Sequence, residues 1–111
     1  MIASATEDSF KADVLNSQHP VLALFHARWC GFCQAFLPIF RRVKGDDVEL
    51  VEVDISDEAS PLWDTYGLEV VPTLILFRNG TVVDRADGRF MRGLREADLE
   101  RLLEAARENE R

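Results

Sequence analysis

Five consecutive apolar residues, at positions 21–25, constrain the fold of this chain more than any other feature. The run is far shorter than the roughly 18 residues that a membrane-spanning helix requires. Its length and the residues that flank it favour a strand buried on both faces. Because strands of this kind lie at the centre of α/β sheets, we expect such a sheet here.

Helical and strand-like patterns alternate along the rest of the chain, with no repeat and no internal linker. A length of 111 residues suits one domain, 1–111. Further strands are expected at 50–53, 74–77 and 81–85, with a weak one at 2–4; helices are expected after Thr6, from the cysteine pair to about Val43, after Ser60, and over about 95–108.

The connections between these elements predict the strand directions. Helices between consecutive strands imply parallel crossovers, whereas Asn79-Gly80 predicts an antiparallel hairpin before the last strand. The expected fold class is therefore α/β, with a central mixed sheet of four to five strands flanked by about four helices.

The net charge of the chain limits the partners that we expect, and its N-terminal residues limit the expected cellular location. A formal net charge of −7 makes nucleic acid and anionic membranes poor partners. The first residues lack a basic segment, and Glu7 and Asp8 interrupt any apolar stretch, so no targeting peptide is expected. We expect a monomeric cytoplasmic protein; a secreted protein already trimmed of its signal is the open alternative.

The two cysteines, Cys30 and Cys33, are too close in sequence to serve as a structural staple. A bridge between them would close a short loop and contribute about 2 kcal/mol at most. They lie instead where the apolar strand meets a helix, and backbone N–H groups at a helix N-terminus favour a thiolate. Cys30 is thus the expected nucleophile for a disulfide, and Cys33, one helical turn later, the resolving thiol.

The cysteine pair also has two interpretations as part of a metal site. A structural zinc needs four ligands. The chain offers only His19 and His26 besides the cysteines, in positions that suit ligation poorly. A metal cluster shared between subunits stays open as a minor alternative. We expect no metal and no cofactor other than the redox-active Cys30–Cys33 disulfide.

Motifs spread over nearly the whole chain resemble those of the thioredoxin family. They include Ala27-Arg28-Trp29-Cys30-Gly31-Phe32-Cys33, Pro38, Tyr66-Gly67, Val71-Pro72-Thr73, Phe77-Arg78-Asn79-Gly80 and Gly88, in the family's order and spacing. The resemblance implies a thioredoxin fold and a protein-disulfide reductase. Its partners would be disulfide-containing proteins and a flavoenzyme that resembles thioredoxin reductase.

The resemblance also implies roles for individual residues. The Val71–Pro72 peptide bond should be cis, and the Val71 backbone should bind an extended substrate peptide. Thr73 belongs to the same substrate-binding motif. An apolar docking surface around Cys30 would be lined by Trp29, Gly31, Phe32, Pro72 and Gly88.

Three positions depart from the family pattern. Phe32 stands where proline is usual, Leu24 replaces a buried acid, and Glu52 replaces a lysine. Our hypothesis is that Glu52 takes over from the missing acid and deprotonates Cys33, directly or through water. The alternative is that Glu52 merely reaches solvent at a sheet edge.

His26 departs from the pattern as well, because relatives often carry an aromatic residue there. A protonated His26 could stabilise the Cys30 thiolate; a packed, hydrogen-bonded substitute for the aromatic ring is the more common situation. Trp63 and Phe36 are predicted to be core residues.

The departures leave the direction of the reaction open. Gly31-Phe32 and the absent acid at Leu24 are compatible with a disulfide oxidant or isomerase, which is the alternative function. A thioredoxin-like docking module without catalysis is the alternative outside this chemistry.

Overall fold

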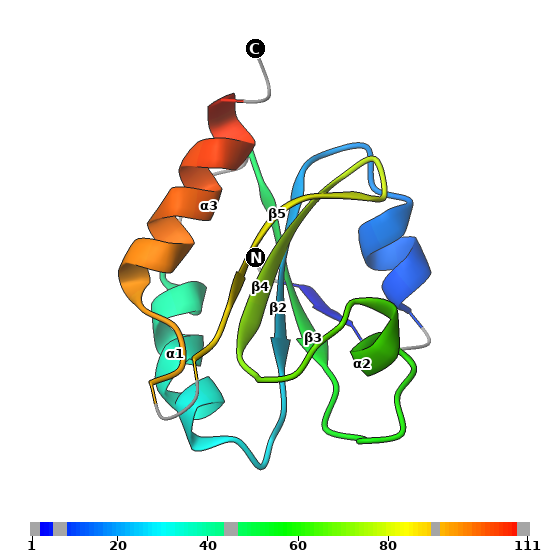
Figure 1. Ribbon diagram of the computed structural model, residues 1–111. Helices are drawn as coiled ribbons and strands as arrows, with labels where there is room; N and C mark the ends of the chain where they lie inside the picture. Colours follow the sequence, from blue (N-terminus) through cyan, green and yellow to red (C-terminus); the bar gives the residue numbers. More distant parts are fainter. Residues whose placement is uncertain (1–2, 6–8, 44–46, 90–91, 109–111) are drawn as a thin grey trace.

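The computed structural model describes residues 3–5, 9–43, 47–89 and 92–108 (Figure 1). Strands and helices follow the predicted order. They are β1 (Ala3–Ala5), the π-helical η1 (Lys11–Leu15), β2 (Val21–His26), α1 (Gly31–Arg41), β3 (Glu49–Asp54), α2 (Leu62–Thr65), β4 (Thr73–Arg78), β5 (Thr81–Asp87) and α3 (Glu96–Glu108). The predicted cap of the first helix, Thr6, lies outside the described residues. No helix in these described ranges is long and apolar enough to cross a membrane.

The five strands form one mixed sheet in the order β1-β3-β2-β4-β5. β1 and β2 both pair with β3 in parallel, while β4 pairs antiparallel with β2 and with β5. The expected parallel crossover into β4 is therefore wrong. Because α2 spans only Leu62–Thr65, it is too short to carry the chain back along the sheet, and β4 starts from the edge where β3 ended.

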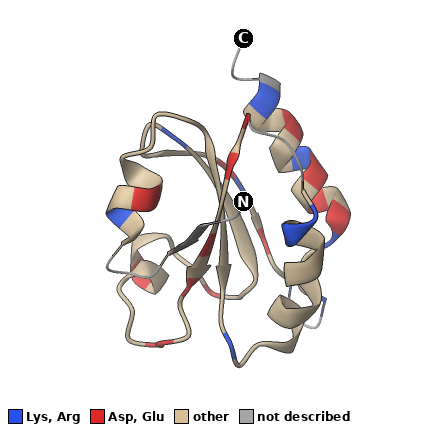
Figure 2. Cartoon of the chain, turned by 180° about the vertical axis from the view of Figure 1, so that it is seen from behind, with Lys and Arg blue, Asp and Glu red and all other residues tan. Residues whose placement is uncertain are grey.

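Helices cover both faces of the sheet (Figure 1). Alternate residues of β2 point to opposite sides. Leu22 and Leu24 join one core cluster with residues of α1 and α3, and Phe25 joins the other with residues of η1 and α2. β2 is buried along its whole length, as its unbroken apolar run predicts. The charged side chains instead lie mainly on outer elements such as α3, while α1 carries no charge before Arg41 (Figure 2).

The predicted hairpin joins β4 to β5. Both turn residues have positive φ, 52° at Asn79 and 78° at Gly80, as a two-residue type I′ turn requires. The tip of the hairpin reaches the end of η1, where a Cβ added to Gly80 would lie 2.9 Å from the carbonyl oxygen of Leu15. The turn is thus part of the packing between the two elements.

Candidate active site

The Cys30 side chain caps the N-terminus of α1. Its Sγ accepts a hydrogen bond from the Cys33 N–H at 3.3 Å and donates one to the Val71 carbonyl oxygen at 3.4 Å. Both cysteines are free, and the Cys30 side chain is partly exposed. The reduced dithiol therefore has one accessible sulfur, held at a helix N-terminus and against the loop before β4.

Cys33 lies one turn further along α1 and is fully buried. Burial, reinforced by the hydrogen bond with Cys30, raises the pKa of the Cys33 thiol to about 12. Cys33 is thus a protonated thiol at neutral pH, screened from solvent behind the first sulfur. This unequal pair suits an attacking and a resolving thiol.

The segment before β4 forms the surface opposite the cysteines. Its Val71–Pro72 peptide bond is cis, as the resemblance implies. A Cβ added to Gly88 would overlap the carbonyl oxygen of Pro72, so only glycine fits where β5 ends. The Thr73 hydroxyl donates to the carbonyl oxygen of Val70 at 2.7 Å and is directed into this loop.

Exposed aromatic side chains flank Cys30 on both sides in sequence. Trp29 is 56% exposed and Phe32 is 42% exposed. Phe32 packs against Gly93, where an added Cβ would lie 2.9 Å from the Phe32 Cβ. At Gly31 an added Cβ would meet nothing within 4 Å, so this glycine borders open space.

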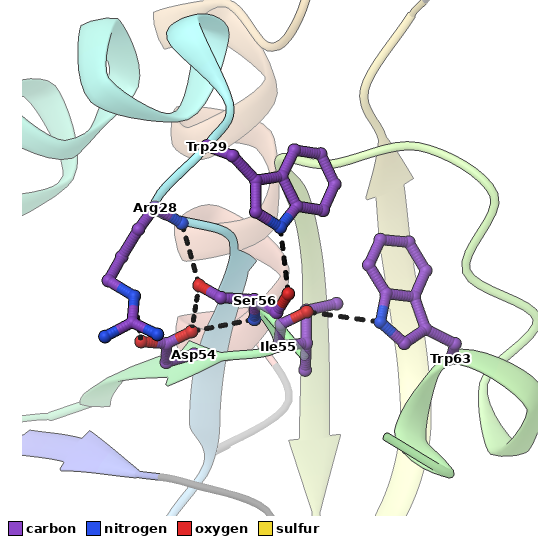
Figure 3. A network of polar contacts seen from close by, with 6 residues as sticks. All are labelled: Arg28, Trp29, Asp54, Ile55, Ser56 and Trp63. Atoms are coloured by element: carbon purple, nitrogen blue, oxygen red, sulfur yellow. Dashed lines mark hydrogen bonds and ion pairs between the residues drawn. The ribbon is translucent and has the colours of Figure 1, made fainter. Parts of the chain in front are cut away.

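Trp29 is held by contacts that the sequence did not reveal. Its Nε1 donates to the Ser56 carbonyl oxygen at 2.8 Å, and its ring stacks on Trp63 with centroids 6.3 Å apart (Figure 3). Ser56 also accepts a hydrogen bond from the Arg28 N–H at 2.8 Å. Trp63, predicted to be a core residue, packs only partly into the core and is partly exposed.

Glu52 forms an ion pair rather than facing a thiol. Arg41 donates to both of its carboxylate oxygens, each at 2.8 Å. β3 lies between β1 and β2, and Glu52 is only 6% exposed, so the sheet-edge alternative is wrong. Arg41 belongs to α1 and Glu52 to β3, so no spacing in the sequence identifies this pair.

No carboxylate is among the groups that shift the pKa of Cys33, which are Cys30 and the Ala27 backbone besides burial. The described contacts therefore place Glu52 with Arg41 and not with Cys33. The role of Glu52 as a proton acceptor stays a prediction, and its ion pair is the competing role.

His26 ends β2 opposite Asp54 of β3. Burial lowers the pKa of His26, and this effect outweighs the nearby Asp54 and Glu52 carboxylates. A neutral, buried imidazole at neutral pH fits the packed substitute for an aromatic ring better than a cation that stabilises Cys30. Its Nδ1 has no hydrogen-bond partner, which departs from the satisfied packing that we expected.

The part of the chain that the structure describes contains no cluster of side chains that could hold a metal ion. No group of three or more His, Cys, Asp and Glu side chains gathers there. The two cysteines meet backbone groups and each other instead.

Comparison with known proteins identifies the family. A family model described as Thioredoxin matches residues 1–104. Thioredoxin from Mycolicibacterium smegmatis is 37% identical over 89 residues, 77% of this chain and 80% of that protein. Thioredoxin Y1, chloroplastic, of Arabidopsis thaliana is 37% identical over 86 residues, 75% of this chain and 49% of that protein.

The fold is similar as well. The crystal structure of thioredoxin F from spinach chloroplast (short form) superposes with a TM-score of 0.81 at 26% identity, covering 96% of this chain and 93% of that one. A family model that spans nearly the whole sequence, and relatives more than one-third identical, mean that this protein belongs to the thioredoxin family of protein-disulfide oxidoreductases.

Proposed function

We propose that this protein reduces the disulfides of other proteins by dithiol exchange, with Cys30 as the nucleophile and Cys33 as the resolving thiol. One observation carries the proposal: a partly exposed Cys30 sulfur at the N-terminus of α1 lies in front of a buried, protonated Cys33. A substrate can reach the first sulfur and not the second.

The reaction has two exchange steps. The Cys30 thiolate attacks one sulfur of the substrate disulfide, the substrate S–S bond breaks, and the other sulfur leaves as a thiolate. Cys33 then attacks Cys30 Sγ, the mixed disulfide breaks, and the second substrate sulfur leaves with the proton that Cys33 loses. The substrate gains two electrons, and the protein is left with a Cys30–Cys33 disulfide.

The Val71–Pro72 loop and the flanking aromatic residues are the proposed docking surface. An extended peptide could pair with the Val71 backbone as a short added strand. Trp29, Phe32, Pro72 and Gly88 would then contact apolar side chains next to the substrate disulfide. The position of the Val71 carbonyl, 3.4 Å from Cys30 Sγ, supports this arrangement.

Recycling requires an external dithiol. We propose a flavoenzyme that resembles thioredoxin reductase as the donor. The cytoplasm, where thiols are kept reduced, is the proposed compartment, and cell redox homeostasis and electron transport are the corresponding processes.

The direct test is the reduction of insulin with dithiothreitol as the electron donor. We expect turnover by the native protein and none by Cys30→Ser. Cys33→Ser should accumulate a mixed disulfide with insulin, visible on a non-reducing gel. Equal turnover by Cys30→Ser and the native protein would reject the assignment of the nucleophile. A native protein without turnover that associates stably with a partner would favour the docking module.

A disulfide oxidant or isomerase is the second candidate, because Phe32 and Leu24 stand where the resemblance implies a proline and a buried acid. A reduction potential measured against glutathione separates the two functions. A potential near that of strongly reducing thioredoxins supports the reductase, about −270 mV, and one near −120 mV would establish the oxidant.

A further inference from the structure

The two tryptophans of this chain stack on each other next to the nucleophile. Trp29 immediately precedes Cys30, whereas Trp63 belongs to α2. Their ring centroids are 6.3 Å apart and their planes differ by only 7°. The stack therefore joins the cysteine loop to an element that is distant in sequence.

Both indole N–H groups donate to carbonyl oxygens of the same short stretch of backbone, residues 55–57. Trp29 Nε1 donates to the Ser56 carbonyl oxygen at 2.8 Å, and Trp63 Nε1 donates to Ile55 at 3.2 Å and to Asp57 at 3.3 Å. Figure 3 shows the Trp29 ring above Ser56 and the Trp63 ring to the side of Ile55. With their N–H groups fixed to neighbouring carbonyls, each ring limits the tilt of the other.

Polar contacts also join this stretch to Arg28, in the loop that leads to Cys30. The Ser56 hydroxyl accepts from the Arg28 N–H at 2.8 Å, and the Ser56 N–H donates to Asp54 at 2.8 Å. Arg28 and Asp54 also form an ion pair at 3.8 Å (Figure 3). These contacts connect Asp54 at the end of β3, through Ser56, to Arg28, the residue before Trp29.

Trp29 needs such support because more than half of its surface is open to solvent. A side chain with 56% exposure and one hydrogen bond can rotate about its χ angles unless a neighbour restrains it. Among the described residues, Trp63 is the aromatic ring that stacks on it. A contact surface held in its binding orientation loses less entropy when a partner docks.

We propose that Trp63 is a positioning residue: it holds the Trp29 indole in the orientation in which that ring lines the docking surface for protein substrates. The inference rests on the proposed function. It separates two classes of substrate: a protein disulfide has flanking residues that contact Trp29, whereas a small disulfide needs only the Cys30 sulfur. Trp63 therefore affects the rate at which protein disulfides are reduced and not the rate for small disulfides.

Two substitutions isolate the stacked ring. Trp63→Phe and Trp63→Leu both remove the indole N–H and both stay apolar, but only phenylalanine keeps an aromatic face. Single-turnover reactions of each reduced protein with insulin and with bis(2-hydroxyethyl) disulfide would be acid-quenched and counted by mass spectrometry. We expect Trp63→Leu to react with insulin about two- to tenfold more slowly than Trp63→Phe, the range for one lost aromatic pair. The rates with the small disulfide should agree within about twofold.

Fluorescence tests the positioning without any turnover. Either substitution leaves Trp29 as the sole tryptophan of the chain. Time-resolved anisotropy should show faster local motion of Trp29 in Trp63→Leu than in Trp63→Phe. Should Trp63→Leu fail to fold, Trp63→Met provides another ring-free side chain for both measurements.

Tyr66→Leu is the matched control for lost packing. Tyr66 follows α2 and contacts the rings of Phe10, Phe25 and Phe77. Tyr66→Leu should lower the free energy of unfolding and leave unchanged the ratio of the rate with insulin to the rate with the small disulfide. Equal insulin rates for the Phe and Leu variants, an equal fall with both probes, or unchanged Trp29 motion would overturn the inference. A native protein that reduces neither probe would reject the proposed function, and the anisotropy comparison would still decide the role of Trp63.

Discussion

The two ends of α1 attach the same helix to the sheet by different kinds of contact. At the first turn, Cys30 and Cys33 contact each other, and Cys30 also contacts the Val71 carbonyl. At the last turn, Arg41 binds both oxygens of the buried Glu52. The reactive end is thus held by contacts that tolerate the making of an S–S bond, while the far end carries the charged anchor.

This contrast predicts a separation of effects. Changes at the thiol end should alter reactivity, whereas changes at the charged end should alter stability and leave the chemistry in place. The substitutions that follow test that separation.

The largest effect should be the difference in reactivity between the two thiols. Because the pKa of Cys33 is raised to about 12, it has roughly three-thousandfold less thiolate at pH 7 than an ordinary cysteine with a pKa of about 8.5. Iodoacetamide at pH 7 should therefore modify Cys30 and leave Cys33 intact, as read by peptide mass mapping. In urea both should react, and equal labelling of the native protein would contradict the contrast.

Gly88→Ala should have the next largest effect. Its Cβ would overlap the Pro72 carbonyl oxygen, so the loop opposite the cysteines must shift. We expect the free energy of unfolding to fall by roughly 2 kcal/mol and insulin reduction to slow. Gly31→Ala is the stability control, because its Cβ meets nothing within 4 Å and alanine favours a helix. If Gly88→Ala is as stable as the native protein, the loop can shift without lowering the free energy of unfolding, which would contradict this prediction.

Arg41→Met tests the charged end. It leaves the buried Glu52 carboxylate without its partner, which should lower the free energy of unfolding by roughly 2 kcal/mol in urea titrations. The rate of Cys30 with bis(2-hydroxyethyl) disulfide should not change. A comparable loss of that rate would show that the two ends are coupled.

Glu52→Gln decides between the two roles of this carboxylate. If Glu52 takes the proton of Cys33, resolution of a mixed disulfide slows in single-turnover experiments. With both oxygens bound to Arg41, we expect lower stability and an unchanged rate of resolution. A slower resolution at unchanged stability would restore the role of proton acceptor.

His26→Phe should have the smallest effect, and only in acid. Burial lowers the pKa of His26, so the unfolded chain binds the proton more readily than the folded one below pH 6.5. Native stability that is complete above pH 6.5 should therefore decline as the pH falls through the lowered pKa. His26→Phe removes this contribution and flattens the stability profile below pH 6.5. Parallel profiles for both proteins would contradict the assignment.

The parts of the fold that depend on local pattern were predictable. The apolar run that became β2, the Asn79-Gly80 hairpin and the order of elements all follow from periodicity and turn chemistry. The direction of β4 was not, because it depends on the length of α2, and the sequence pattern marks where that helix starts better than how far it extends.

The candidate site divides in the same way. Cys30, Cys33 and the cis Val71–Pro72 bond belong to motifs that the sequence displays. The partners of Trp29 and Glu52 do not, because Trp63 and Arg41 reach them only through the packing of α2 and α1 against the sheet. Contacts between elements depend on how these pack, which no single motif encodes.

The contact between the hairpin tip and η1 has a consequence for protein engineering. A hairpin tip is usually a good place for an inserted tag or a lengthened loop. Here Gly80 has positive φ and faces the Leu15 carbonyl oxygen too closely for a side chain. A tag at this turn would separate two packed elements, although it would lie in a surface loop of the kind that normally accepts one.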